Sequence, residues 1–144
     1  MDYFFKQKFN ITELADRPAP SLKIIIMETE EYLVALYTRY LQAHDFVALH
    51  CKEAGGLKDL IVYHQPDLLI IGSGAVLDPA FLLELLFDIK RIFSTLPVIT
   101  IGNNISPQML KQLMSAGISG HIDRRLSKPE DVVAVVKTIL QKNI

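Results

Sequence analysis

The stretch Pro66-Asp67-Leu68-Leu69-Ile70-Ile71-Gly72-Ser73-Gly74 decides the fold of this 144-residue chain. The apolar residues from Leu68 to Ile71 do not alternate with polar ones, which is typical of a strand covered on both faces. Gly72-Ser73-Gly74 then predicts a turn that ends the strand. Because ligands of open parallel sheets bind at the carboxyl ends of the strands, a site is expected here. The turn itself offers no carboxylate, thiol or imidazole.

Outward from this stretch, strands and helices are predicted to alternate. Short apolar runs predict strands, and apolar residues three and four apart predict a helix after each of them. Asp78-Pro79 and Ser106-Pro107 are signals for helix starts. The expected strands are residues 24–27, 46–49, 68–71, 98–101 and 118–122. This alternation predicts an α/β fold of the flavodoxin-like type: a doubly wound, five-stranded parallel sheet of order 2-1-3-4-5 with helices on both faces.

Two segments of different character are expected along the chain. Residues 1–21 form an N-terminal arm that ends in a linker stiffened by Pro18 and Pro20. Residues 22–144 form the α/β domain. The arm is rich in aromatic residues, so it either packs on the domain or contacts a partner.

Composition narrows the functional classes. A formal net charge of −1 gives no electrostatic basis for binding nucleic acid or an anionic membrane. A single cysteine, Cys51, excludes an internal disulfide, and no apolar run reaches the roughly 20 residues of a membrane span. The first residues lack the features of a secretory signal, so a cytoplasmic location is expected. The histidines are scattered, which predicts no metal site.

The predicted strand order brings the ends of the first, third and fourth strands together. These ends are Glu28-Thr29, Gly72-Ser73-Gly74 and Gly102-Asn103-Asn104. The glycine turn matches a phosphate-binding loop only weakly, because the third glycine and the later acidic residue of the dinucleotide motif are missing. These residues include no nucleophile beside a general base and no acid–base pair of carboxylates, so an enzyme is not predicted.

Residues 23 to about 142 resemble the receiver domain of two-component response regulators, the CheY-like proteins. The stretches that carry this resemblance are Lys23 to Glu31, Gln65 to Ile71, Leu96-Pro97-Val98-Ile99-Thr100-Ile101 and Ala116-Gly117-Ile118-Ser119-Gly120-His121-Ile122. The last of these, with Ser127-Lys128-Pro129-Glu130-Asp131, is closest to receivers that precede helix-turn-helix DNA-binding domains. The resemblance implies a role in signal transduction, through a phosphorelay or the regulation of transcription.

Receiver chemistry uses five positions, and this chain departs from the family at each. A carboxylate after the third strand accepts the phosphoryl group, and two acidic residues after the first strand help it hold Mg²⁺. A hydroxyl after the fourth strand and a lysine after the fifth contact the phosphate. By resemblance, these positions fall on Gly72 (acceptor), Glu28 and Thr29 (acidic pair), Gly102 (hydroxyl) and Arg124 (lysine).

The resemblance therefore implies a degenerate receiver that is not phosphorylated by the usual route. A lone Glu28 is a poor ligand set for Mg²⁺, so no cofactor is expected. Glu28 and Arg124 are expected to face each other as an ion pair across the vacated site. The aromatic switch position of the family falls on His121, which could sense pH because histidine titrates near neutrality.

The leading functional hypothesis is a pseudo-receiver that signals by binding protein partners without phosphorylation. By resemblance, the partner face is the last two helices with the fifth strand, and a homodimer through it is a corollary. Its expected residues are Lys111, Gln112, Ser115, His121 and Ile122. The alternative is a sensor that binds a small molecule, anion or nucleotide near Gly72–Gly74 and Arg124. Since the sequence ends four residues after Leu140, the chain is either an adaptor or one domain of a longer polypeptide.

Overall fold

The computed structural model describes residues 21–72 and 78–142. The predictions for the arm before Ser21, and for Ser73 and Gly74 of the turn, fall outside these residues. Strands and helices alternate along the described chain, as the sequence predicts. The elements are β1 (Lys23–Met27), α2 (Glu31–Ala43), β2 (Val47–Cys51), the short 3₁₀ helix η2 (Ala54–Gly56), α3 (Leu57–His64), β3 (Leu68–Gly72), α4 (Pro79–Ile92), β4 (Val98–Gly102), α5 (Pro107–Ser115), β5 (Gly120–Asp123) and α6 (Pro129–Lys142).

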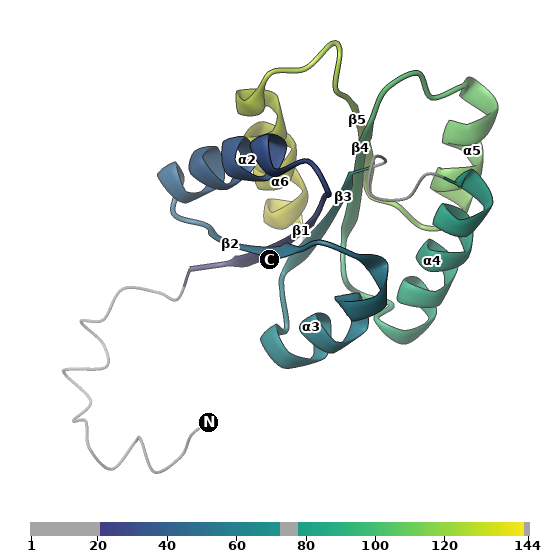
Figure 1. The fold of residues 1–144 in the computed structure, drawn as a ribbon, viewed down its shortest axis with the longest axis horizontal. Helices are drawn as coiled ribbons and strands as arrows, with labels where there is room; N and C mark the ends of the chain where they lie inside the picture. The colour runs from purple at the N-terminus through teal and green to yellow at the C-terminus, as the bar shows by residue number, and fades with distance from the viewer. Residues whose placement is uncertain (1–20, 73–77, 143–144) are drawn as a thin grey trace.

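The five strands form one parallel sheet in the order β2-β1-β3-β4-β5 (Figure 1). This order confirms the predicted topology, in which β1 lies between β2 and β3. The register places Met27 beside both Cys51 and Ile71. Thr100 lies beside Ile71 on one side and His121 on the other. The carboxyl ends of all five strands are thereby aligned along one side of the sheet.

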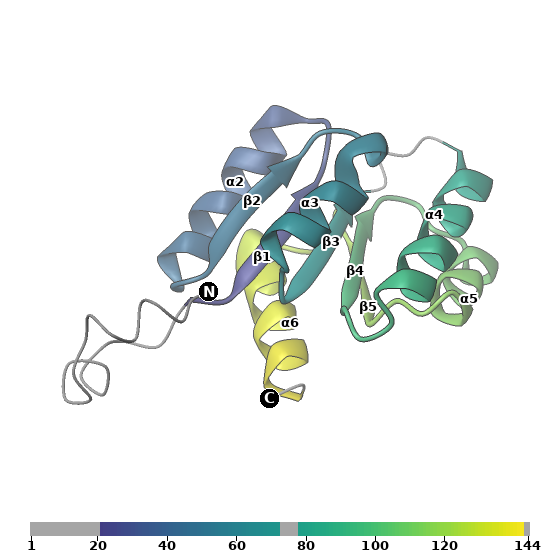
Figure 2. The ribbon, with the colours of Figure 1, turned by 90° about the horizontal axis from the view of Figure 1, so that it is seen from below.

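Helices cover both faces of the sheet (Figures 1 and 2). Alternate strand residues point to opposite faces, so the sheet has two hydrophobic cores. Ile25, Leu69 and Val98 pack with α3, α4 and α5 on one face. Ile24 and Ile70 pack with α2 and α6 on the other face. Every residue of β3 and β4 is buried, which explains their apolar runs without alternation.

Both proline-linked helix starts are confirmed by their caps. The carboxylate of Asp78 accepts a hydrogen bond from Ala80 N at 3.0 Å, and the hydroxyl of Ser106 accepts one from Met109 N at 3.0 Å. Strand boundaries differ slightly from the prediction: β3 includes Gly72, and β5 begins at Gly120 instead of residue 118. Within the described residues, the helices are too short or too polar to cross a membrane.

Candidate functional site

The carboxyl ends of β1, β3, β4 and β5 bring the receiver-like positions together. Because Met27 pairs with Ile71, the next residues along the two strands, Glu28 and Gly72, come side by side. Gly102, the last residue of β4, accepts a hydrogen bond at its carbonyl oxygen from Arg124 N at 2.9 Å. The sheet therefore delivers Arg124 toward the ends of β1 and β3.

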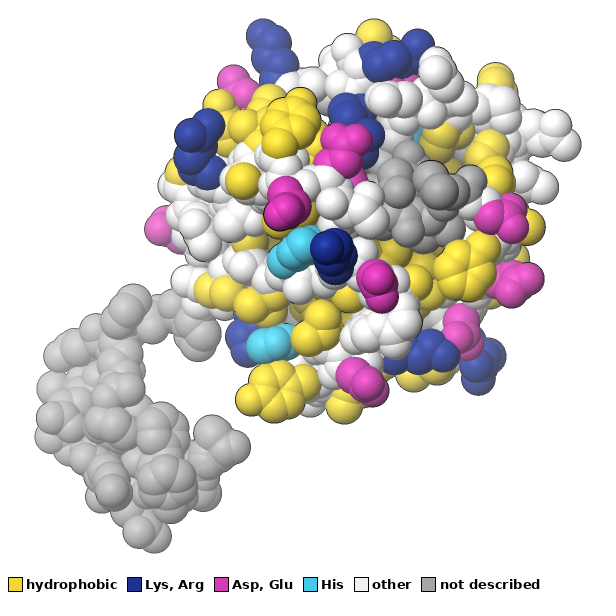
Figure 3. Space-filling view, viewed as in Figure 1, with side chains coloured by type: hydrophobic (Ala, Val, Ile, Leu, Met, Phe, Trp, Pro, Cys, Tyr) yellow, Lys and Arg dark blue, Asp and Glu magenta, His cyan; other side chains and the backbone are white. Residues whose placement is uncertain are grey.

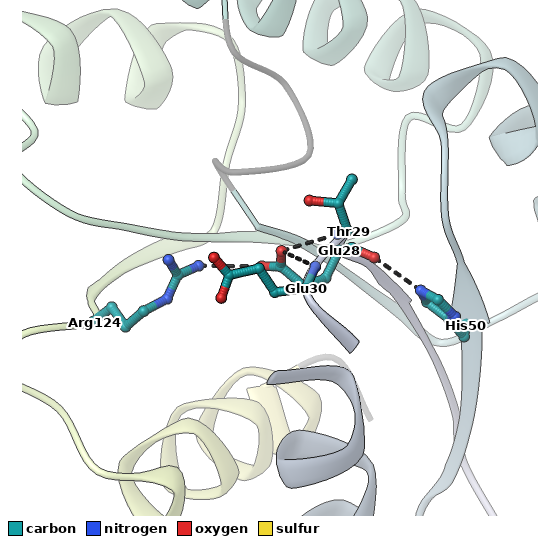
Figure 4. Close-up of polar contacts among 5 residues, drawn as sticks. All are labelled: Glu28, Thr29, Glu30, His50 and Arg124. Atoms are coloured by element: carbon teal, nitrogen blue, oxygen red, sulfur yellow. Dashed lines mark hydrogen bonds and ion pairs between the residues drawn. The ribbon is translucent and has the colours of Figure 1, made fainter. Parts of the chain in front are cut away.

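Glu28 is the centre of this arrangement (Figure 4). Its side chain is only 1% exposed, and its Oε1 lies 3.1 Å from Nη2 of Arg124. Its Oε2 accepts hydrogen bonds from the backbone N–H groups of Thr29, at 2.9 Å, and Glu30, at 3.0 Å. The ion pair predicted between Glu28 and Arg124 is thus confirmed.

The same carboxylate also satisfies the start of α2. Glu30 is the N-cap of this helix, yet its own side chain makes no capping hydrogen bond. Glu28 lies two residues before it and accepts the Glu30 N–H instead. A negative charge near a helix N-terminus is favourable, because the unpaired N–H groups there carry partial positive charge. Glu28 is therefore held by the cation on one side and by backbone amides on the other.

Gly72 leaves the space that Glu28 occupies. A Cβ atom added at Gly72 would lie 2.0 Å from Oε1 and 2.8 Å from Cδ of Glu28. Both distances are far below a van der Waals contact, so no larger residue fits while Glu28 keeps its position. Glycine is required at this position because of the limited space and not because of its backbone conformation. The Glu28 side chain therefore occupies the space that a side chain at Gly72 would need.

The residues present do not fit a magnesium ion, which receiver chemistry would require. Mg²⁺ needs oxygen ligands in near-octahedral geometry, but each Glu28 oxygen is already hydrogen-bonded to Arg124 or to backbone N–H groups. The Arg124 guanidinium, 3.1 Å from Oε1 of Glu28, also places a positive charge beside this carboxylate, which would oppose the binding of a cation. Among the described residues, no three His, Cys, Asp or Glu side chains converge as a metal site.

Arg124 borders a small cavity between α2 and α6. The cavity has a volume of about 190 Å³, and Tyr37, Ser127 and Lys128 also line it. Burial raises the pKa of Tyr37, while a hydrogen bond to Arg124 and its positive charge act in the opposite direction. Nε of Arg124 is buried and has no hydrogen-bond partner among the described residues. This N–H is therefore left unsatisfied by the described residues.

His121 lies in β5, half-buried against β4. Its Nδ1 is 2.8 Å from the hydroxyl oxygen of Thr100, which is its neighbour in the sheet register. Burial lowers the pKa of His121, and the nearby Asp123 carboxylate opposes that shift. The imidazole is therefore kept neutral near pH 7, and protonation requires a lower pH than for an exposed histidine.

The residues expected on the partner face separate into exposed and buried ones. Lys111, Gln112 and Ser115 are exposed on α5, and they line a hollow beside α4. Ile122 is only 5% exposed and packs in the core under α2 and α6. The prediction that Ile122 belongs to the exposed partner face is wrong, because side chains alternate along β5 and that of Ile122 points into the core.

Sequence reasoning missed two contributors to the site. Nothing in the sequence indicated that Tyr37, on α2, lies beside Arg124. The hydrogen bond from Nε2 of His50 to the carbonyl oxygen of Glu28, at 2.8 Å, depends on the pairing of β1 with β2. The Glu28–Gly72 contact could have been predicted from the sequence, because Glu28 directly follows β1 and Gly72 ends the neighbouring strand β3.

No protein-family model matches the sequence, and neither does any curated protein. Solved structures do share the fold. A response regulator from Thermotoga maritima superposes with a TM-score of 0.77 at 14% identity, covering 84% of this chain and 98% of that chain. HP1043, an orphan response regulator of H. pylori, gives 0.75 at 18% identity, covering 85% and 99%. A CheY-like receiver domain protein from Methanospirillum hungatei gives 0.72 at 16% identity, covering 85% and 95%.

The sheet order and the helices on both faces define a doubly wound α/β protein of the flavodoxin-like class. Within that class, the chain has the CheY-like fold of response regulator receiver domains. At these identities the likeness concerns the fold.

Proposed function

We propose that this chain is a pseudo-receiver: a non-catalytic signalling module that acts by protein contact and is not phosphorylated. The receiver fold supports a signalling role. The proposal also places the protein in the cytoplasm, where two-component signalling takes place, without a bound cofactor and without nucleic acid or membrane binding by this domain.

One observation carries this proposal. The Glu28 carboxylate fills the space where a side chain at Gly72 would begin, 2.0 Å from the position of its Cβ, and is paired with Arg124 at 3.1 Å. Phosphoryl transfer depends on a positioned nucleophile and a metal that offsets charge on the phosphoryl oxygens. We propose that the Glu28–Arg124 ion pair occupies this region of the chain in place of the nucleophile and the metal.

The test is incubation of the protein with acetyl phosphate, or with beryllofluoride, in the presence of Mg²⁺. We expect no added phosphoryl group by intact-protein mass spectrometry. We also expect no saturable Mg²⁺-dependent shift of the backbone amide signals around Gly72. Saturable shifts there, or a covalent phosphoryl group, would contradict the proposal.

A matched variant serves as the positive control for this experiment. It combines Gly72→Asp with Glu28→Asp, Thr29→Asp and Arg124→Lys, which restores four of the five family positions and shortens the carboxylate that blocks the acceptor. We expect Mg²⁺-dependent amide shifts with beryllofluoride in this variant and none in the natural sequence. Shifts in the variant would show that the amide signals detect beryllofluoride binding when the receiver residues are present, so their absence in the natural sequence would be meaningful.

Contact with a protein partner is proposed to use the exposed residues of α5. Lys111, Gln112 and Ser115 lie together on this helix, and half-buried His121 lies in β5. A variant with Gln112→Glu and Ser115→Glu, compared with the natural sequence in a pull-down from the source cell, tests this surface. Loss of a specific partner in the variant supports it, and an unchanged set of partners counts against it.

A second candidate function is favoured by the buried, unpartnered Nε of Arg124. The Arg124 side chain lines the 190 Å³ cavity together with Ser127 and Lys128, and these three side chains carry donors for a small anion. A thermal-shift series with inorganic phosphate and with nucleotides tests this anion-sensor hypothesis. Stabilisation that is lost in Arg124→Lys, which keeps the charge but removes Nε, supports it. No stabilisation, or stabilisation unchanged in that variant, counts against it.

A further inference from the structure

The outer face of α4 exposes aromatic side chains that the fold does not use. Phe87 is 56% exposed and Phe81 is 47% exposed. In the space-filling view, hydrophobic side chains lie on the surface over α4, with acidic and basic side chains next to them (Figure 3). Large apolar side chains that remain in contact with water, with charged residues around them, are typical of a protein–protein contact surface.

Phe87 forms a ridge between two hollows. On one side, a hollow of about 510 Å³ lies between α4 and η2, and Gly55 contributes to its lining. On the other side, a hollow of about 250 Å³ lies between α4 and α5, lined by Leu83, Phe87 and Lys111 among others. A ridge beside a hollow on one helix is a self-complementary shape, because a second copy brings the same ridge to the same hollow.

The charges on α4 are self-complementary as well. Glu84 and Arg91 lie seven residues, or about two turns, apart on the same side of the helix, with Phe87 between them. When two α4 helices pack antiparallel about a two-fold axis near Phe87, Glu84 of each copy meets Arg91 of the other. Glu84 forms no ion pair with any other described residue. Asp88, near the axis, is paired with Lys58, which compensates its charge. Arg91 also contacts Asp88, but its side chain is 72% exposed and so is open to a second carboxylate.

We propose that α4 is a homodimer interface, in which a second copy of this chain packs antiparallel on the outer face of α4. Phe87 of each copy enters the hollow between α4 and η2 of the other copy. The two Glu84–Arg91 ion pairs between the copies fix the register of the two helices. An interface of one helix and its flanking hollows is small, below roughly 1,200 Å² in total, which is typical of weak association. We therefore expect a dissociation constant on the order of micromolar.

This surface is centred on α4 and includes neither β5 nor α6. It shares Lys111, Gln112 and Ser115 of α5 with the partner face proposed above, because these residues line the smaller hollow. Among the described residues, the large hydrophobic side chains that are exposed include none from α6, whose outer face is polar. Leu126, in the loop before α6, is 81% exposed and marks that other face. It supplies a matched control, since Phe87→Glu and Leu126→Glu each place a charge at an exposed apolar position.

Sedimentation velocity over a concentration series tests the proposal. The natural chain should shift from monomer to dimer between low and high micromolar concentration. Phe87→Glu should weaken the association at least tenfold, while Leu126→Glu should leave it unchanged. A chain that remains monomeric into the millimolar range would overturn the proposal. So would a dimer that Leu126→Glu weakens and Phe87→Glu does not.

Charge exchange tests the antiparallel register. Glu84→Arg should weaken the dimer, because two arginines then face each other, and adding Arg91→Glu should restore most of the lost affinity. Gly55→Gln provides an independent probe, since no atom lies within 4 Å of a Cβ at Gly55 and the variant should fold normally while filling the hollow. An unchanged dissociation constant in Gly55→Gln, or no recovery in the charge exchange, would reject this geometry.

Discussion

At the residue scale, Glu28 and Gly72 complement each other in size. We predict that Gly72→Ala lowers the free energy of unfolding by about 1–3 kcal/mol, the usual cost of overpacking a buried site. Combining it with Glu28→Asp should lose less than the sum of the two single changes, because the shorter carboxylate vacates the space. Urea denaturation of the four proteins measures this coupling. Strictly additive losses would show that the two residues do not compete for space.

The Glu28–Arg124 pair is the second feature at this scale. Arg124→Met should lower the free energy of unfolding by about 3–5 kcal/mol, since it leaves the Glu28 carboxylate buried without its cation. The neighbouring Arg125→Met is the control. It removes an ion pair to Asp123 that is largely exposed to water, so its effect should be much smaller. Equal losses in the two variants would count against a structural role for the buried pair.

His121 makes the stability of the folded chain depend on pH, and the direction of this dependence follows from its pKa. Burial lowers its pKa in the folded state, so the unfolded chain binds the proton more tightly. Its contribution to stability is therefore complete above the unfolded pKa of about 6.5 and is lost as the pH falls through the folded pKa. Chemical denaturation at several pH values should show that the natural chain loses more stability below pH ~6.5 than His121→Gln. Parallel curves for the two proteins would contradict this.

At the element scale, two helices depend on caps that the sequence signals. Asp78→Ala and Ser106→Ala should each lower the free energy of unfolding by about 1 kcal/mol, because the N–H groups of Ala80 and Met109 lose their acceptors. Asp78→Asn keeps an acceptor oxygen and should cost less. Thermal denaturation of the three variants tests this, and a harmless Asp78→Ala would mean that water replaces the cap.

The elements were the part most readily predicted from sequence. Hydrophobic period and proline-linked caps are local signals, so β3, α4 and α5 appear close to where they were expected. The start of β5 was placed too early, because Ile118 is apolar and buried without being paired as a strand. The Glu28–Arg124 pair was predicted from the receiver resemblance, because strand order alone brings together only the ends of the first, third and fourth strands. The contacts of Tyr37 and His50 were not predicted, because they depend on the packing of α2 and on the register between β1 and β2.

At the scale of the whole molecule, the sheet is most protected at its centre. β3 and β4 are buried at every residue, whereas the edge strands β2 and β5 are mostly half-buried or exposed. Native-state hydrogen exchange should therefore be slowest for amides of β1, β3 and β4, whose opening requires global unfolding. Edge strands that exchange as slowly as the central ones would indicate that an additional contact, such as another chain, covers them.

The contact between Glu28 and Gly72 also bears on how the chain can evolve. Gly72→Asp alone drives a second carboxylate into filled space, and Glu28→Asp alone shortens the partner of Arg124 without creating an acceptor. Each first step lowers stability before the second can bring any benefit, so the two positions are epistatic. Under the pseudo-receiver proposal, a mutational path from this chain to a phosphorylatable site needs both changes, and stability is expected to fall at the first of them.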